Sequence, residues 1–400
     1  MTFPSGLRAL NHRNFRRFFI GQAVSLVGTW MQSVAQSWLV LQLTDSAFKL
    51  GLIGALQFAP VLAFAVLAGA LADRLPKRRV LLGTQTLLAT QALTLAALVW
   101  SGHVRFWHVG LLALVLGFAN ALDMPARQSF VADLVVKEDV VNAVALNSAA
   151  FNAARIVGPA VAGLLIARVG VAPAFVLNGL SFLVVIAALL ATNVQGHSRR
   201  TGPTTILEEI REGLAYARHT PRIRFILSVL LVVSLSVFNF SVLVPLLARN
   251  VLHQGAEGFG FLMAAIGLGA VAGALTLGML GRRPRLRVIV GAGALACAAF
   301  LGVAFVRDFA LALAVLFVVG FAAIIAAAGC NTTLQVIAPD ALRGRVMSLY
   351  VLIFGGSFPV GAFLMGAISE RWGVSTAFFV GGATGLLGLA VIMIASRARR

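Results

Sequence analysis

The chain alternates between long apolar runs and short polar interruptions. A helix that crosses the hydrocarbon core of a bilayer needs about 20 apolar residues. Twelve runs have this length, and an even number of crossings places both ends of the chain on one side of a membrane. The pattern therefore predicts an all-α membrane protein whose twelve helices lie at 18–42, 50–72, 80–100, 106–130, 142–167, 171–193, 224–248, 258–280, 287–305, 309–334, 346–368 and 374–395.

The composition excludes a water-soluble protein, because 60% of the residues are hydrophobic and only 11% are charged, whereas soluble domains carry roughly 25% charged residues. The net charge of +19 would suggest a nucleic-acid partner in a soluble protein. Here all but six of the 32 Lys and Arg residues fall in or near the segments on one side of the membrane. Positive charge of this kind marks cytoplasmic loops. We therefore expect cytoplasmic termini, a first helix that is retained rather than cleaved, and no nucleic acid.

The longest polar interruption, 194–223, separates two sets of six helices. We expect an N-terminal bundle at 1–193, a cytoplasmic linker at 194–223 and a C-terminal bundle at 224–400. Within the linker, Thr205 and Glu208 have the spacing of a capping box. The apolar residues that follow lie on one helical face, which predicts an amphipathic helix on the inner membrane surface.

The two halves contain a sequence repeat. The segment from Val157 to Gly179 aligns with the segment from Val360 to Gly382 at a constant offset of 203 residues. The identical residues include four glycines of each segment: 158/361, 163/366, 170/373 and 179/382. Because each half has an even number of helices, the halves are expected to be parallel repeats with pseudo-twofold symmetry.

Polar residues form a stripe along one face of the first predicted helix, 18–42. A polar stripe in a bilayer must face water or other protein. One interpretation is the lining of a central cavity, with Asn152, Asn239 and Asn331 as weaker additions, and the other is hydrogen bonding between helices. The stripe consists of Gln22, Ser25, Thr29, Gln32 and Gln36, three or four residues apart.

Two of the charged residues inside the apolar runs are candidates for a functional role. Arg155 falls near mid-membrane, where an unpaired charge costs at least about 2.5 kcal/mol. It is expected to contact substrate in a cavity or to clamp its helix by donating to neighbouring carbonyls. Asp123 falls near the inner boundary, with Lys77 and Arg78 as expected partners, so a structural ion pair is favoured over a protonation site.

Two motifs resemble those of the major facilitator superfamily. The hairpin from Gly69 to Arg79 is similar to the G-x-x-x-D-R/K-x-G-x-R/K-R/K loop between the second and third helices, with Pro76 in place of the internal glycine. The stretch 154–163 resembles the exporter-associated pattern g-x-x-x-G-P-x-x-G-G. Candidate gating residues on these grounds are Gly69, Asp73, Arg74, Arg78, Arg79, Asp123, Gly158, Pro159 and Gly163.

The resemblance extends over the whole chain, and further segments, such as 28–32 and 125–128, resemble the bacterial branch with the enterobactin exporter and macrolide-efflux-like proteins. It implies the major facilitator fold and a monomeric exporter in the bacterial inner membrane. The expected cargo is a small molecule such as a siderophore, drug or amphipathic metabolite. The expected mechanism is alternating access with proton antiport.

Two alternatives remain open: an importer or lysophospholipid flippase on the same fold, and a membrane enzyme. The six histidines are scattered over loops and linker, and no phosphate-binding loop of the G-x-x-x-x-G-K-[ST] type is present. The enzyme is therefore disfavoured, and neither a metal nor a cofactor is expected.

Overall fold

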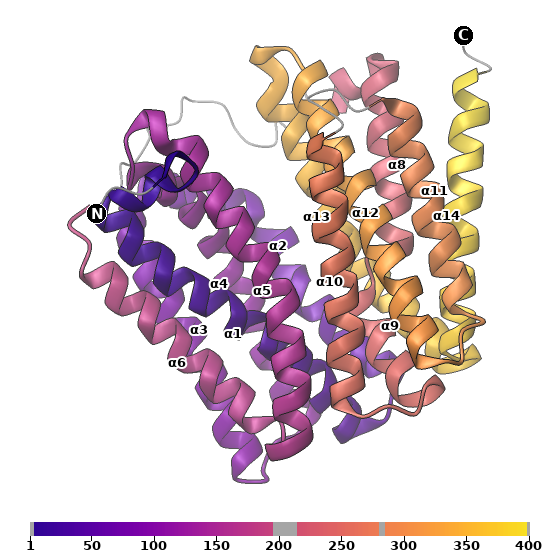
Figure 1. Cartoon of the computed structure of the whole chain (residues 1–400), viewed down its shortest axis with the longest axis horizontal. Helices are drawn as coiled ribbons and strands as arrows, with labels where there is room; N and C mark the ends of the chain where they lie inside the picture. Colours follow the sequence, from indigo (N-terminus) through magenta and orange to yellow (C-terminus); the bar gives the residue numbers. More distant parts are fainter. Residues whose placement is uncertain (1–3, 195–213, 280–284, 398–400) are drawn as a thin grey trace. The chain divides into compact units, whose positions relative to one another are not determined.

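The computed structural model describes residues 4–194, 214–279 and 285–397, without the side chains of 5, 65–74, 340, 341 and 397. In these residues the chain is helical and contains no β-strand (Figure 1), which confirms the all-α prediction. The main helices are α1 (Arg13–Thr44), α2 (Ala47–Arg74), α3 (Lys77–Trp100), α4 (Phe106–Asp133), α5 (Val140–Val169), α6 (Ala172–Leu190), α8 (Pro221–Val237), α9 (Phe240–Leu246), α10 (Ala256–Met279), α11 (Leu286–Val303), α12 (Phe309–Ile337), α13 (Asp340–Trp372) and α14 (Val374–Arg397).

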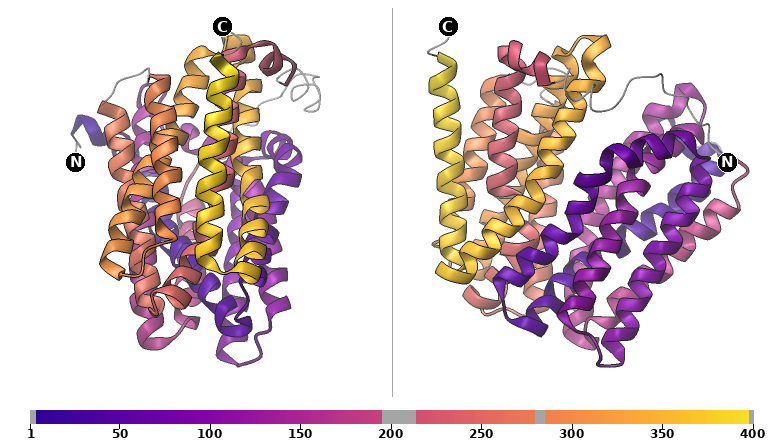
Figure 2. Two further views of the ribbon diagram at one scale, coloured as in Figure 1. Left: turned by 90° about the vertical axis from the view of Figure 1, so that its right-hand side faces the viewer. Right: turned by 180° about the vertical axis from the view of Figure 1, so that it is seen from behind.

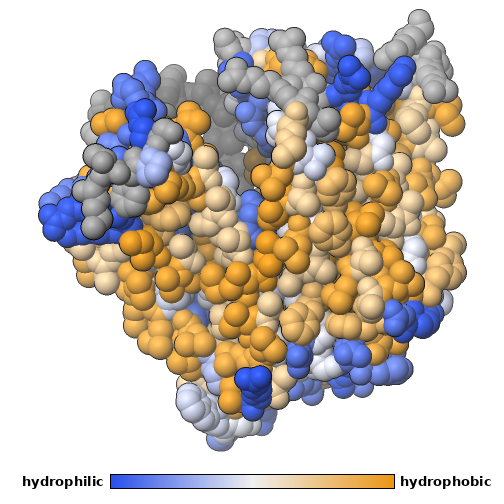
Figure 3. Space-filling view, viewed as in Figure 1, coloured by the Kyte–Doolittle hydropathy of each residue, from blue (hydrophilic) through white to orange (hydrophobic). Residues whose placement is uncertain are grey.

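The helices have the length and apolar character that a bilayer requires. Among the described residues, 11 helical segments are long and apolar enough to cross a membrane. The remaining predicted span, α1, contains 32 residues, which is about 48 Å of helix, and its three buried glutamines lower its hydropathy. Hydrophobic side chains cover the middle of the helices in each unit, with hydrophilic side chains toward their ends (Figure 3).

The chain divides into two compact units, residues 1–44 with 56–202 (unit 1) and 45–55 with 203–400 (unit 2). The short segment 45–55, which the sequence pattern assigns to the first half, groups with unit 2 because it packs on α13. A Cβ atom at Gly51 would lie 3.0 Å from the Cα atom of Gly366. The Glu370 carboxylate also accepts hydrogen bonds from the Ser46 hydroxyl at 3.2 Å and the Phe48 N–H at 3.1 Å.

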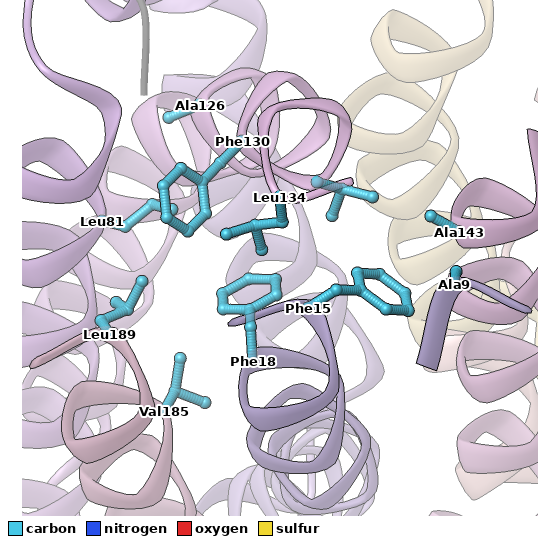
Figure 4. Packing of buried hydrophobic residues seen from close by; sticks show 11 residues of the cluster. Ala9, Phe15, Phe18, Leu81, Ala126, Phe130, Leu134, Ala143, Val185 and Leu189 are labelled. Carbon is cyan, nitrogen blue, oxygen red and sulfur yellow. The ribbon is translucent and has the colours of Figure 1, made fainter. Parts of the chain in front are cut away.

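In unit 1, α1 packs against α5 and α6, and α3 packs against α4 and α6, within a bundle of long helices (Figure 2). At one end of the unit, buried aromatic and aliphatic side chains of several helices meet in one cluster (Figure 4). Within it, Phe18 and Phe130 contact edge to face, with ring centres 5.5 Å apart and an angle of 78°. Such a pair adds about 0.5–1.5 kcal/mol beyond its buried area.

The N-terminal 3-10 helix η1 (Ser5–Asn11) is tied to the start of α5. Arg8 and His12 each approach the Asp139 carboxylate to 2.8 Å. The Asn142 side chain accepts from the Ala9 N–H at 2.9 Å and donates to the Gly6 carbonyl at 2.6 Å. These bonds place the N-terminal segment against unit 1.

Unit 2 repeats these helix contacts of unit 1: α8 packs on α13 and α14, and α11 packs on α12 and α14. In addition, α12 packs on α10. The repeat is visible in the backbone as well. Gly170 ends α5 with a φ of +82°, and Gly373, 203 residues later, ends α13 with a φ of +84°. Only glycine adopts this conformation without strain, so the predicted repeat has a structural counterpart.

The predicted single run at 224–248 is interrupted. Helix α8 ends at Val237, Phe238 and Asn239 are non-helical, α9 begins at Phe240, and a π-helical turn η3 (Leu247–Val251) follows. Hydropathy does not reveal this break, because Pro221–Val251 as a whole is apolar enough to be taken as one membrane span. The described part of the linker is helical at 214–219, whereas Thr205 and Glu208 lie outside the described residues.

Candidate functional site

Gln32 is the centre of a buried hydrogen-bond network between α1, α3 and α6. Its Nε2 donates to Gln91 Oε1 at 2.9 Å, and its Oε1 accepts from Asn178 Nδ2 at 2.6 Å. All three amides are buried. Hydrogen bonds of this kind hold membrane helices together. For Gln32, the interpretation as a residue that joins helices by hydrogen bonds is therefore the one that the structure supports.

The other stripe residues divide into buried and exposed members. Gln36 donates to Gln57 Oε1 of α2 at 3.0 Å, and Gln22 and Ser25 are buried. Thr29 is exposed, and its hydroxyl donates to the Ser25 carbonyl at 2.9 Å. At about 100° per residue, Thr29 lies opposite the exposed apolar Ile20. Thr29 is thus the exposed member of the five stripe residues.

Arg155 lies midway along α5 and stacks on Trp30 of α1. Its guanidinium carbon is 5.7 Å from the centre of the indole ring. Phe151, one turn earlier, contacts the same ring edge to face at 5.8 Å. No hydrogen bond or ion pair joins Arg155 to another described residue. The cation–π contact therefore orients the guanidinium and leaves its N–H donors available.

Gly158 and Pro159 bring α5 close to α1. A Cβ atom at Gly158 would lie 2.5 Å from Trp30 Cβ and 2.9 Å from the Val27 carbonyl oxygen. Gly163 is buried farther along the same helix. The exporter-like motif thus forms a small-residue contact between helices, next to the Arg155–Trp30 pair.

The expectation that Asp123 pairs with Lys77 or Arg78 is wrong. Asp123 is buried and accepts from Arg127 Nε at 2.7 Å, with Arg127 Nη2 at 2.5 Å. Thr84 and Gln85 of α3 donate to its other oxygen at 2.7 and 2.8 Å. Arg127 lies one helical turn after Asp123 on the same face, which makes it the nearest cation. The carboxylate is an ion-paired structural centre between α3 and α4.

The cations of the basic hairpin bind elsewhere in unit 1. Lys77 is buried and contacts the Asp133 carboxylate at 2.7 Å. Arg78 donates to the carbonyls of Leu189 and Leu190 at 2.8 and 3.0 Å. It thereby caps the negative C-terminal end of α6.

Arg79 of the same hairpin is exposed. The side chains of Gly69, Asp73 and Arg74 lie outside the described residues. Their proposed part in gating stays a prediction.

The three candidate asparagines are in different settings. Asn152 donates to the Ser148 carbonyl of its own helix at 2.8 Å, and Asn331 accepts from Gln335 at 2.5 Å. Asn239, at the break between α8 and α9, is buried and donates to the Leu235 carbonyl at 2.8 Å. Its Oδ1 has no hydrogen-bond partner among the described residues.

Sequence reasoning missed a series of aromatic side chains on α13. Tyr350, Phe354 and Phe358 are four residues apart and lie on one helical face. Phe354 contacts Phe238, at the helix break, edge to face at 5.1 Å. The repeat offset was the available signal, since Phe354 lies 203 residues after Phe151.

Comparison with known proteins identifies the family. The family model described as transmembrane secretion effector (MFS_3) matches residues 4–400. Among curated proteins, the enterobactin exporter EntS of Shigella flexneri is 26% identical over 97% of this chain and 93% of its own length. The multidrug efflux pump Tap of Mycolicibacterium fortuitum is 27% identical over 88% of both chains. The staphyloferrin A transporter of Staphylococcus aureus is 23% identical over 91% of this chain and 92% of its own.

Solved structures agree on the fold. A bacterial homologue of the lysosomal transporter Spinster matches with a TM-score of 0.72 and 15% identity over 96% of this chain and 95% of its own. The nucleoside transporter NupG matches with a TM-score of 0.73 and 14% identity over 95% of this chain and 99% of its own. The chain therefore belongs to the transmembrane secretion effector family of the major facilitator superfamily, and it is a multi-pass membrane transporter of small molecules, not an enzyme.

Proposed function

We propose that this protein is a secondary active exporter of an amphipathic small molecule, working as a monomer in the bacterial inner membrane with both termini in the cytoplasm. The relatives named for enterobactin export, staphyloferrin A transport and multidrug efflux support this substrate range. The concentration of Lys and Arg in alternate loops supports the orientation.

The observation that carries the proposal is the position of Arg155. A guanidinium near the middle of a membrane helix is costly unless it is paired or hydrated, and its contact in unit 1 is the face of Trp30. Its planar fork of donors matches carboxylate and other oxygen-rich groups. We infer that Arg155, with the exposed Thr29 nearby on α1, binds an anionic or oxygen-rich part of the substrate.

Alternating access is the mechanism we propose for moving the substrate. Gly158 and Pro159 permit the close approach and bending of α5 beside the Arg155 contact. The residues of the basic hairpin, Asp73 above all, are proposed to bias the equilibrium between states.

Proton antiport is the coupling we propose, on the strength of the superfamily resemblance. Asp123 is not the proposed proton carrier, because Arg127, Thr84 and Gln85 already bind both of its oxygens. Its role in the proposal is to join α3 and α4.

Inside-out membrane vesicles that contain the protein test the proposal. Enterobactin and staphyloferrin A are supplied outside, and uptake is measured with the vesicle lumen acidified or at equal pH. An exporter coupled to protons accumulates one of these substrates only with the acidic lumen, and vesicles without the protein do not. An equal rate of uptake with the acidified lumen and at equal pH would overturn proton antiport. Transport confined to right-side-out vesicles, or movement of lysophospholipid alone, would instead favour the importer or flippase.

A further inference from the structure

Unit 2 contains two aromatic clusters that differ in how they are packed. In the first, Phe240, Phe300 and Phe378 are all buried, and Phe300 contacts Phe378 at 4.8 Å between ring centres. This cluster closes the core between α9, α11 and α14. The second cluster, which we call the α13 aromatic series, consists of Tyr350, Phe354, Phe358 and Phe238.

The α13 aromatic series is only partly enclosed. Phe238 is buried, whereas Tyr350, Phe354 and Phe358 are half-buried. The rings of Tyr350 and Phe354 are nearly parallel, with an angle of 9° and centres 5.8 Å apart, and Phe358 stands perpendicular to Phe354 at 5.4 Å. The series therefore offers ring faces and edges that the protein does not fully cover.

The repeat indicates which way this face points. Residues 151 and 155 of α5 correspond to 354 and 358 of α13 at the offset of 203. Phe151 contacts Trp30 edge to face at 5.8 Å, and Phe354 contacts Phe238 edge to face at 5.1 Å. Because Arg155 would be costly on a lipid-facing surface, its face in unit 1 is turned away from lipid. The equivalent face of unit 2 carries Phe358 in place of the arginine.

Two polar features border the series. Phe238 and Asn239 form the break between α8 and α9, and broken helices near mid-membrane are common binding elements in transporters. Asn239 is 2% exposed, and its Oδ1 is left without a partner among the described residues. At the other end, the Tyr350 side chain lies near that of Asn331, which accepts from Gln335.

We propose that the α13 aromatic series is a binding subsite for an aromatic ring of the substrate, with hydroxyl or carbonyl substituents directed to Asn331 and Tyr350. The proposal rests on the transport function proposed above. Aromatic pairs prefer offset-stacked and edge-to-face geometries, which is the arrangement that the series already shows among its own rings. A saturated ring of equal size has no such preference.

The test uses 2-naphthol and its saturated counterpart decahydro-2-naphthol as probes. Binding to the protein in lipid nanodiscs is measured by calorimetry, with empty nanodiscs subtracted. We expect the wild type to prefer the aromatic probe, and Phe354→Leu and Phe358→Leu each to lower that preference by about three- to tenfold. Phe354→Tyr, which keeps the ring, should retain it.

Phe379→Leu is the matched control. Phe379 of α14 is exposed and contacts Phe305, a ring outside the series, at 6.2 Å, so its loss should not change the preference. Equal binding of both probes to the wild type, or an unchanged preference in Phe354→Leu, would overturn the subsite and assign the series to packing or lipid contact only. This readout is independent of transport. Failure of the vesicle experiment would overturn the proposed function and leave the ring preference intact.

Discussion

Equivalent positions of the two units carry different chemistry on the same helical frame. Helices α4 and α12 both begin with phenylalanine, at Phe106 and Phe309, 203 residues apart. At that offset the ion pair Asp123–Arg127 of unit 1 is replaced in unit 2 by Ala326 and Cys330, both buried. In the same way, Arg155 corresponds to Phe358. Unit 1 thus places charges and amides where unit 2 has apolar and aromatic side chains.

The glycines that set the helix contacts are shared. Gly179 faces Leu93 of α3, and Gly382 faces Leu301 of α11, each leaving less than 3.0 Å for an added Cβ atom. The close approach of neighbouring helices at these glycines is therefore common to both units, while the side chains at other equivalent positions differ. The comparison shows that the glycine contacts between helices can be kept while the charge and polarity of neighbouring side chains change.

The largest effect is expected where the ion pair of unit 1 is broken. Asp123→Ala leaves the largely enclosed Arg127 without its carboxylate, which should lower the free energy of unfolding by about 3–5 kcal/mol. Detergent-solubilised protein, unfolded by titration with SDS, gives this quantity. The double variant Asp123→Ala/Arg127→Cys copies the pair of unit 2 and should recover most of the loss. Equal stability of the single variant and the wild type would show that the pair is not structural.

A smaller difference is expected between two equivalent glycines. Gly158→Ala drives a methyl group against Trp30 Cβ and the Val27 carbonyl, whereas at Gly361 the closest atoms belong to the Asn239 side chain. A side-chain end can move and backbone cannot. Gly158→Ala should therefore cost about 1–3 kcal/mol of stability and Gly361→Ala less. Thermal unfolding of the two variants side by side decides this, and a greater loss in Gly361→Ala would reverse the comparison.

Substitutions of Arg155 distinguish a role in substrate binding from a role as a structural clamp between α5 and α1. If the guanidinium contacts substrate, Arg155→Ala should weaken transport affinity about tenfold with an unchanged melting temperature. Arg155→Lys keeps the charge, loses the fork of donors and should also weaken affinity. Arg168→Ala, at an exposed position near the end of the same helix, is the control. Wild-type affinity in Arg155→Ala, together with a lowered melting temperature, would leave only the clamp.

The smallest effect is expected in the hairpin, whose second copy at 281–287 lacks an aspartate. A carboxylate near a helix N-terminus contributes about 0.3–1 kcal/mol, so Asp73→Asn should slow transport about two- to fivefold. Expression and membrane insertion should stay near normal, as judged by immunoblot of the membrane fraction. Turnover equal to that of the wild type would remove Asp73 from gating.

Several properties follow from the sequence by itself. The twelve spans are evident because the bilayer imposes a minimum apolar length. The described residues of each run are largely helical, with the run at 224–248 broken at Phe238 and Asn239. The repeat is evident because glycines such as Gly170 and Gly373 keep positions that only glycine fits. The family is evident from the spacing of the hairpin and Gly-Pro motifs, which local chain geometry preserves.

Partners and exposure were decided by the tertiary structure. Arg127 rather than Lys77 meets Asp123, Gln32 bonds Gln91 and Asn178, and Phe354 meets Phe238. Hydropathy shows whether a side chain is apolar or polar, but it does not show which neighbouring helix that side chain will contact. That choice depends on the rotation and separation of packed helices, which close contacts such as Gly158 against Trp30 set. For the same reason, only the folded units distinguish the buried glutamines of α1 from the exposed Thr29.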